Sequence, residues 1–339
     1  AATLPTATGM SEWPGWDSRE LDLWTQTEGR FNPQTQCGEH RRVPPHAAST
    51  ATTGMSQRLE GMAGRISVVT PTVESRQEFH HLLWTCFNSQ TWLNKELIIV
   101  ETYKNKFSEY FYEKAKVDPR ITYVKFQIAP TSLDWSIGLK RNIGAHLATG
   151  EIIAQFDDDD LYAPSYLSTL AGELKTQVHG LGITLSSWYI FDTDTGSFGY
   201  CDPIRWGNMH NLDTTDNKVR RWVYGYGFSY VYYRKALLEN PMQDRNMGED
   251  FRFYSQLQER YGDSCIVLLP DNDGVCCHKQ HGENTSSSVA LWEISREEMS
   301  DLDVADSGSH FNIYTNFLNP RKDGRQSKYI EDWTGTGGH

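Results

Sequence analysis

The chain has 339 residues, and 32 Lys and Arg against 44 Asp and Glu give it a formal net charge of −12. This length is sufficient for a large core in one or two domains. The negative charge disfavours nonspecific binding to nucleic acid and argues against a generally basic surface for anionic membranes. No apolar run is long enough to span a membrane, and no signal peptide is visible.

Six cysteines do not amount to a disulfide framework in a chain of 339 residues. No C-x-x-C pair occurs among them, which argues against a structural zinc site. The adjacent Cys276 and Cys277 fit two neighbouring positions of a strand, with side chains on opposite faces.

Residues 1–63 show no periodic apolar pattern and contain Pro5, Pro14, Pro33, Pro44 and Pro45. This composition predicts an extended N-terminal arm or linker. Trp13, Trp16 and Trp24 are costly to leave in water, so we expect part of the arm to lie on the surface of a folded domain.

The first ordered segment is predicted at residues 66–72, a short β-branched run that contains a proline near its end. Ser75 and Glu78 then form the pattern of a capping box. Apolar residues at helical spacing over residues 79–87 predict that a helix follows.

Residues 97–101 and 121–124 predict two further buried strands. A helix is predicted after these two strands, over residues 138–148, because Leu139, Ile143 and Leu147 are spaced one helical turn apart. This alternation of strands and helices is typical of a parallel α/β sheet.

The second half of the chain is less regular. Residues 183–191, 228–233 and 266–269 predict strands. A helix is predicted after Glu249 and Asp250, on the spacing of Phe251, Tyr254, Leu257 and Tyr261.

Residues 156–160 have the sequence Phe-Asp-Asp-Asp-Asp and follow an apolar run, 152–154, that predicts a buried strand. Adjacent carboxylates repel one another, so such a cluster usually persists because a cation binds there. An EF-hand is excluded, since Leu161 and Tyr162 stand where it needs a ligand and a glycine. The run at a strand end therefore indicates a Mg²⁺ or Mn²⁺ site, with a solvated acidic turn as the alternative.

Several segments resemble, in order and spacing, the core of a family 2 glycosyltransferase of GT-A fold. They are residues 66–72, 97–101, 140–151, 156–160, 225–228, 248–251 and 281–286. The resemblance implies an α/β fold with a mixed, mainly parallel sheet flanked by helices on both faces. It covers residues 64–290, with a nucleotide-sugar half at 64–160, an acceptor half at 161–290 and a C-terminal extension at 291–339.

The resemblance implies that Thr70, Pro71 and Thr72 flank the nucleoside of a nucleotide sugar. Glu101 stands where the family usually has an Asp that contacts the uracil or ribose. The segment Arg141-Asn142 is implied to face the nucleotide, with an exposed helix charge as the alternative for Arg141.

Within the acidic run, Asp157 and Asp159 match the D-x-D pair of the family. Asp160 matches the Asp after that pair, which sometimes binds the metal itself. The resemblance thus assigns Asp157, Asp159 and Asp160 to Mn²⁺ or Mg²⁺, and Asp157 and Asp158 to the nucleotide. Asp158 leaves the register of the metal ligand open, because it is acidic too. His281 is implied to complete the metal site or touch the diphosphate, and His278 competes for that role.

Glu249 and Asp250 match the E-D pair that opens a helix in the family, which makes Asp250 the general base. A carboxylate near the acceptor hydroxyl takes its proton as the oxygen attacks the anomeric carbon. The metal and Arg141 would hold the departing diphosphate. One direct displacement inverts the anomeric centre. The alternative for Glu249 and Asp250 is a pair of helix N-terminal acids.

Aromatic residues crowd the implied acceptor half. Its candidate acceptor contacts are Trp222, Tyr226, Gly227 and Phe228. A sugar ring packs its C–H face on an aromatic plane, but such residues lie more often in a core than on a platform.

The resemblance implies a metal-dependent, inverting transfer from a nucleotide-diphosphate sugar, with UDP favoured, to a hydroxyl of a glycan, lipid, protein or small molecule. One alternative is a sugar nucleotidyltransferase, which should carry a Gly-rich loop that residues 72–76 lack. The other is a non-catalytic carbohydrate- or nucleotide-binding relative, which should have lost these carboxylates. A cytoplasmic location is expected, or the Golgi lumen if an upstream anchor has been removed.

Overall fold

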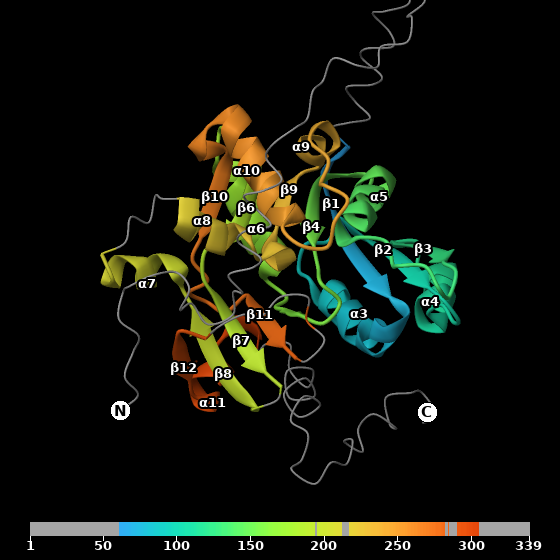
Figure 1. Ribbon diagram of the computed structural model, residues 1–339, viewed down its shortest axis with the longest axis horizontal. Coiled ribbons are helices and arrows are strands. Elements are labelled where there is room, and N and C mark those ends of the chain that lie inside the picture. The colour runs from blue at the N-terminus through green and yellow to red at the C-terminus, as the bar shows by residue number, and fades with distance from the viewer. Residues whose placement is uncertain (1–60, 194, 212–216, 282–283, 285–289, 305–339) are drawn as a thin grey trace, which may run out of the picture.

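The computed structural model describes residues 61–304 except 194, 212–216, 282–283 and 285–289 (Figure 1). The predicted arm therefore lies outside the described residues up to residue 60, together with its three tryptophans, and so does the chain after residue 304. No helix in the described part of the chain has both the length and the apolar character of a membrane span.

A seven-stranded sheet forms the centre of the fold, in the order β10-β6-β9-β4-β1-β2-β3. Strand β1 pairs in parallel with β2 and β4, and β9 is antiparallel to both of its neighbours. The predicted mixed, mainly parallel sheet is thus confirmed. Its strands are β1 (Met62–Val73), β2 (Lys95–Tyr103), β3 (Ile121–Gln127), β4 (Gly150–Gln155), β6 (Gly182–Leu185), β9 (Val231–Tyr233) and β10 (Ile266–Leu269).

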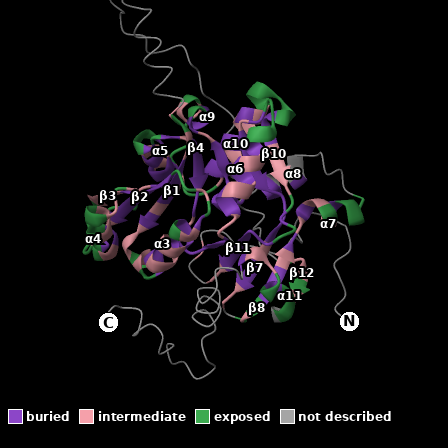
Figure 2. Cartoon of the chain, turned by 180° about the vertical axis from the view of Figure 1, so that it is seen from behind, coloured by how far each residue is buried: buried purple, intermediate pink, exposed green. Residues whose placement is uncertain are grey.

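Helices cover both faces of this sheet, and for that reason its central strands are apolar on both sides. Neighbouring residues of β1 enter opposite cores, Val68 on one face and Val69 on the other. Figure 2 shows the buried residues concentrated in these central strands. One core takes side chains from α3 (His80–Ser89), α4 (Glu109–Val117) and α6 (Tyr166–Thr176). The other takes them from α5 (Ile137–Leu147), α9 (Arg234–Glu239) and α10 (Glu249–Tyr261).

A second, five-stranded sheet lies below the first in Figure 1 and was not predicted. Its order is β12-β8-β7-β11-β5, and only β7 and β11 run in parallel. The strands are β5 (Leu161–Tyr162), β7 (Trp188–Asp192), β8 (Ser197–Cys201), β11 (Cys276–Gln280) and β12 (Trp292–Ile294). The sheet therefore continues past residue 290. The short helices α7 (Pro203–Met209), α8 (Asn217–Tyr224) and α11 (Arg296–Ser300) complete the α-helices of the described residues.

The strand predicted at residues 183–191 is wrong, because the chain changes sheets within it. β6 ends at Leu185 and β7 begins at Trp188. Between these strands the backbone N–H of Ser186 donates to the carbonyl of Leu269, and the Ser187 hydroxyl accepts a hydrogen bond from the backbone N–H of Asp271. The strand predicted at residues 228–233 is shorter than expected, since residues 227–229 form a 3-10 turn before β9.

The predicted capping box of Ser75 and Glu78 is also wrong. Residues 74–79 form a 3-10 helix, η2 (Glu74–Phe79), whose first turn has no side-chain cap. Tertiary contacts hold this segment instead, since the Glu74 carboxylate accepts backbone N–H bonds from Lys104, Asn105 and Lys106. These three bonds also lower the pKa of Glu74.

The helix predicted at residues 138–148 is confirmed as α5, but its buried face differs from the predicted one. Leu147 is exposed, whereas Arg141 and Gly144 are buried. A Cβ on Gly144 would lie 2.3 Å from the Val69 side chain, so glycine lets the helix approach β1 closely. Arg141, one turn before Gly144 on the same helix, pairs with Asp157 just after β4.

We expect Gly144→Ala to lower the free energy of unfolding by about 1–3 kcal/mol, because the added methyl overpacks the contact with Val69. Gly172→Ala in α6 is the matched control, since a Cβ there meets nothing within 4 Å. It should stabilise the fold by roughly 0.5–1 kcal/mol through helix propensity. Urea unfolding measures both, and a G144A protein as stable as the wild type would contradict the close approach.

Candidate active site

The predicted site residues lie where the parallel strands β1, β2 and β4 end. Glu101 is near the end of β2, and the acidic run follows β4. The N-terminus of α10 adds Glu249 and Asp250, and β11 leads to His281. Ligands bind at the carboxyl ends of strands in open α/β sheets. The fold thus brings together residues from both predicted halves of the chain.

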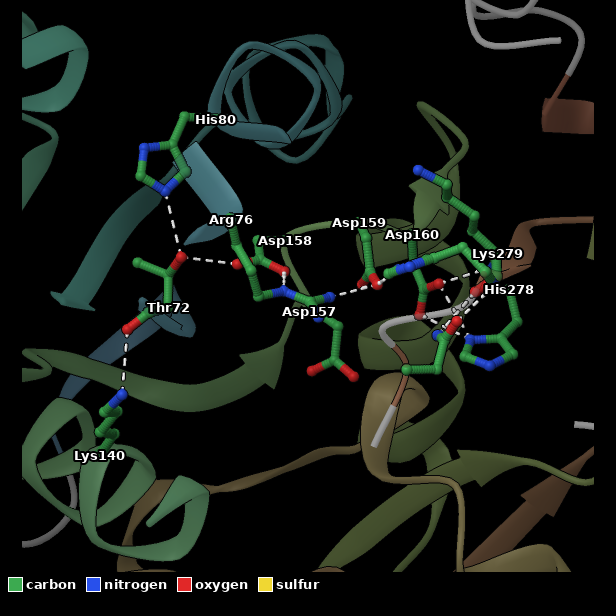
Figure 3. Close-up of polar contacts among 12 residues, drawn as sticks. Thr72, Arg76, His80, Lys140, Asp157, Asp158, Asp159, Asp160, His278 and Lys279 are labelled. Carbon is green, nitrogen blue, oxygen red and sulfur yellow. Dashed lines mark hydrogen bonds and ion pairs between the residues drawn. The ribbon is translucent and has the colours of Figure 1, made fainter. Parts of the chain in front are cut away.

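The four aspartates of the run differ in their partners, although Asp158 and Asp159 share Arg76 (Figure 3). Asp158 points back to β1, where it accepts hydrogen bonds from the Thr72 hydroxyl at 2.6 Å and Arg76 Nε at 2.7 Å. The same guanidinium pairs with Asp159. Asp157 is the most exposed of the four and pairs with Arg141 at 3.2 Å.

The two histidines of the predicted metal site divide between two aspartates. His281 Nε2 lies 2.7 Å from Asp159 Oδ2, and His278 Nδ1 lies 2.9 Å from Asp160 Oδ1. Asp160 also accepts the backbone N–H of Lys279 at 2.8 Å. Each carboxylate of this buried group is thus held by a cation or a donor.

These contacts oppose the cost of burying the carboxylates. Burial raises the pKa of Asp158 although the Arg76 charge opposes it, and raises the pKa of Asp160 although His278 opposes it. For Asp159 the hydrogen bond from His281 and the charge of Arg76 outweigh burial and hold its pKa below the usual range. Among the three buried aspartates of the run, Asp159 is therefore the one whose surroundings favour the negative charge.

Arg141 links the acidic run to the start of α10. Its guanidinium is buried. One terminal nitrogen, Nη2, lies 3.2 Å from Asp157, and the other, Nη1, lies 2.7 Å from Glu249. Glu249 Oε2 is buried without a hydrogen-bond partner among the described residues. Burial and the neighbouring Asp250 raise the pKa of Glu249, and burial also raises that of Asp250.

Asp250 is held by backbone donors. Its two carboxylate oxygens accept the N–H groups of Gly227 at 2.9 Å and Phe251 at 2.6 Å. A Cβ on Gly227 would lie 2.8 Å from Asp250 Oδ2, so only glycine allows this approach. The loop of residues 225–228 thus positions the predicted base.

On the predicted nucleoside side, Glu101 is fully buried. It accepts hydrogen bonds from Gln77 at 2.6 Å, from the Ser108 N–H at 3.0 Å and from the Tyr123 hydroxyl. Thr70 is also buried, and its hydroxyl has no partner among the described residues. Pro71 follows Thr70 in β1, before Thr72.

Some predicted residues have their side chains engaged elsewhere. The Asn142 amide pairs with both backbone groups of Met242, at 2.8 and 3.0 Å, and ties α5 to the loop before α10. Trp222, Tyr226 and Phe228 are buried members of the core. Phe228 stacks on the ring of His278, with centroids 4.8 Å apart. These three aromatic residues thus pack in the core, and their contact with an acceptor stays a prediction.

Sequence reasoning missed Arg76, His80, Lys140 and Lys279. Lys140 donates to the Thr72 carbonyl at 3.1 Å, and the Lys279 ammonium lies 3.9 Å from the centre of the Phe79 ring. Lys140 stands directly before Arg141, and this pair of adjacent cations was an available signal. Arg76 and His80 gave none, because their partners are distant in sequence.

The donor set fits Mn²⁺ or Mg²⁺ that is shared with a diphosphate. Two ligands at right angles, each about 2.1 Å from an ion, lie about 3 Å apart, and the pair of Asp159 and His281 is close to this spacing at 2.7 Å. His278 Nε2 is buried without a partner while Asp160 holds Nδ1, an arrangement that also orients histidine ligands. No three His, Cys, Asp or Glu side chains in the described ranges form a metal site by themselves. Phosphate oxygens and water would complete the coordination.

Residues 67–240 match the sequence profile of Glycosyl transferase family 2. No curated protein sequence matches the chain. A similar solved structure is the mannosyltransferase PcManGT from Pyrobaculum calidifontis with GDP-Man and Mn²⁺. It has 15% identity and a TM-score of 0.48, over 65% of this chain and 58% of that one. This chain therefore spans less than two thirds of that protein.

Two further solved structures are similar. S. aureus TarS 1-349 with UDP-GlcNAc has 16% identity and a TM-score of 0.48, over 66% of this chain and 62% of that one. Glucosyl-3-phosphoglycerate synthase from M. tuberculosis, with Mn²⁺, UDP-Glc and phosphoglyceric acid, has 14% identity and a TM-score of 0.45, over 82% and 86%. The family match at residues 67–240 covers more than half of the 339 residues, and the chain therefore belongs to the family 2 glycosyltransferases.

Proposed function

We propose that this glycosyltransferase moves a sugar from a UDP-linked donor to an acceptor hydroxyl, with inversion at the anomeric carbon and with help from Mn²⁺ or Mg²⁺. Residues 64–160 would bind most of the donor and residues 161–290 most of the acceptor. The acceptor belongs to the glycans, lipids, proteins or small molecules that carry a free hydroxyl.

The observation that carries the proposal is the bridge made by Arg141. One buried guanidinium contacts both Asp157 of the acidic run and Glu249 beside the predicted base. Arg141, which would hold the departing diphosphate, is thereby bonded to Glu249, the residue next to Asp250, which would activate the acceptor. Hydrogen-bond donors that are held in place before the reaction stabilise the charge that develops in the transition state without having to reorganise.

Asp250 is the general base in this mechanism. The backbone N–H groups of Gly227 and Phe251 fix its carboxylate, while its remaining lone pairs can accept a proton from the acceptor hydroxyl. That oxygen attacks the anomeric carbon from the face opposite the diphosphate, so one displacement inverts the centre. Glu249 keeps Arg141 oriented by its bond at 2.7 Å.

A divalent ion held by Asp159, with Asp157 or Asp160 and with His281 or His278, would neutralise charge on the departing diphosphate. The residues of this chain do the rest. Arg76 keeps Asp158 and Asp159 together, and Arg141 remains between Asp157 and Glu249. Thr72 and Glu101 would contact the nucleoside from the ends of β1 and β2.

Release of nucleoside diphosphate from a panel of UDP- and GDP-sugars, with and without Mn²⁺, tests the proposal. We expect UDP release that depends on the metal. With an α-linked donor, NMR should show a β-linked product. A product that retains the donor configuration would contradict the single displacement. Release of GDP from GDP-sugars, without release of UDP from UDP-sugars, would contradict the choice of uracil as the nucleobase of the donor.

We expect Asp159→Asn to weaken Mn²⁺ binding in the presence of UDP by at least about 10- to 100-fold, because that range is seen for residues that only orient the metal ligands. The amide oxygen is a weaker ligand than the ionised carboxylate that the His281 and Arg76 contacts maintain. Titration calorimetry measures the affinity. Asp301→Asn, at an exposed position, is the control. Unchanged Mn²⁺ affinity in D159N would remove Asp159 from the ligand set.

A further inference from the structure

His80 lies between the two ends of the site, yet none of the proposed roles uses it. It is fully buried at the start of α3. Its Nε2 lies 3.1 Å from the Thr72 hydroxyl, and its Nδ1 lies 2.7 Å from the Ser108 hydroxyl. Figure 3 shows the two hydrogen bonds that join His80 to Thr72 and Thr72 to Asp158, a continuous row of hydrogen-bonded side chains that bends at Thr72.

The acceptor at the end of this row fixes the direction of each hydrogen bond. The Thr72 hydroxyl donates its single proton to Asp158 at 2.6 Å, and the other oxygen of that carboxylate accepts from Arg76. Thr72 must then accept from His80, so Nε2 carries the imidazole proton. Nδ1 must accept from Ser108, because a neutral imidazole has one donor and one acceptor.

The surroundings of His80 support this neutral form. Burial, reinforced by the charge of His81, lowers the pKa of His80 to about 3. The ring also packs against Phe111, with centroids 4.9 Å apart. His80 therefore has one tautomer and one orientation.

Both ends of the row reach residues that belong to the proposed donor site. The Ser108 backbone N–H donates to Glu101 at 3.0 Å, next to the predicted nucleoside. Asp158 shares Arg76 with Asp159, at the predicted metal end. The row of Ser108, His80, Thr72 and Asp158 thus joins segments that bind opposite ends of one nucleotide.

We propose that His80 is a positioning residue that couples the nucleoside end of the donor site to its diphosphate end. It orients the Thr72 hydroxyl toward Asp158 and thereby fixes Arg76 and Asp159, while Ser108 keeps Glu101 in place. The inference rests on the proposed function, because it assumes that a nucleoside diphosphate spans these two ends.

Two substitutions separate the halves of the row. Glutamine can place an amide N–H near the position of Nε2 and keep the donor to Thr72, whereas asparagine reaches only the position of Nδ1. We expect His80→Asn to weaken UDP binding in Mn²⁺ by about 10- to 100-fold, with little change in uridine binding, and His80→Gln to retain most of the affinity. His146→Asn, at an exposed position of α5, is the control.

Calorimetry with UDP and uridine, with and without Mn²⁺, measures these affinities, and thermal unfolding measures stability. A merely structural role would lower stability in both variants and leave the ratio of UDP to uridine affinity unchanged, which would overturn the inference. Wild-type protein that binds no UDP in Mn²⁺ would instead overturn the proposed function.

Nitrogen-15 NMR of the histidine side chains tests the tautomer without any ligand. We expect one imidazole signal, absent from H80Q, with the proton on Nε2 and none on Nδ1, unchanged between about pH 5 and 8. A proton on Nδ1, or a ring that becomes charged in this range, would overturn the inference whether or not the protein binds UDP.

Discussion

Asp250→Asn is expected to lower kcat by about 10²- to 10⁴-fold, because the amide cannot take the proton of the acceptor hydroxyl. KM for the donor should change little, since the donor contacts proposed here do not include Asp250. In the wild type, burial raises the pKa of this carboxyl. Activity should therefore fall as the pH drops through that raised pKa, where the base becomes protonated. Initial rates of UDP release from pH 5 to 9 measure both effects.

The amide of D250N provides one acceptor for the two backbone N–H groups that the carboxylate holds. Thermal unfolding must therefore accompany the kinetics. Asp301→Asn serves again as the surface control, because Asp301 is exposed. A folded D250N protein with kcat within a fewfold of the wild type would show that another group takes the proton.

Arg141→Gln is expected to lower the free energy of unfolding by about 3–5 kcal/mol, the cost of removing one partner from a buried ion pair. Glu249 loses its cation, and Asp157 loses its contact at 3.2 Å. Transfer should also be lost, because the departing diphosphate would keep the divalent ion but lose the guanidinium that helps to hold it. Arg141→Lys should be inactive too. The ammonium of lysine is a point charge and lacks the planar guanidinium fork that reaches both carboxylates. Urea unfolding and UDP release measure the two losses.

The double variant R141Q/E249Q separates stability from catalysis. It removes the buried charge that the single variant leaves unpaired, so we expect most of the lost stability to return while transfer stays absent. Arg252→Gln is the matched control, because its pair with Glu259 lies at the surface and is worth about 1 kcal/mol or less. A double variant no more stable than R141Q would contradict the account of Arg141.

The central strands were predictable because each contains a short, mostly apolar run, such as residues 97–100 of β2, as a sheet covered on both faces requires. The strand predicted at residues 266–269 is β10, residue for residue. The second sheet was not predictable in this way. Its strands are short, and β7 pairs with β11, where Tyr189 faces Cys277 from a distant part of the chain. Local propensity contains little information about such pairing.

Some residues of the candidate site could likewise be predicted from the sequence, and others could not. The acidic run and the pair of Glu249 and Asp250 are visible in the sequence because carboxylates rarely cluster without a cause. Arg76 and His80 are not, because each has a local pattern typical of a helix start. Their roles depend on Asp158 and Ser108, which only the fold brings near. For α5 the apolar spacing even predicted the wrong face, since its buried face carries Arg141.

The pairing of β5 with β11 has a consequence for synthesis of the chain. Leu161 and Tyr162, directly after the acidic run, pair with Cys277 and Cys276, directly before His278. On the ribosome, the nascent chain would carry its aspartates for more than a hundred residues before the histidines emerge. Until then the buried carboxylates would lack two of their partners. We therefore expect strands β1 to β4 of the central sheet, which end at Gln155, to pair first and the ability to capture a divalent ion to mark the last step of maturation.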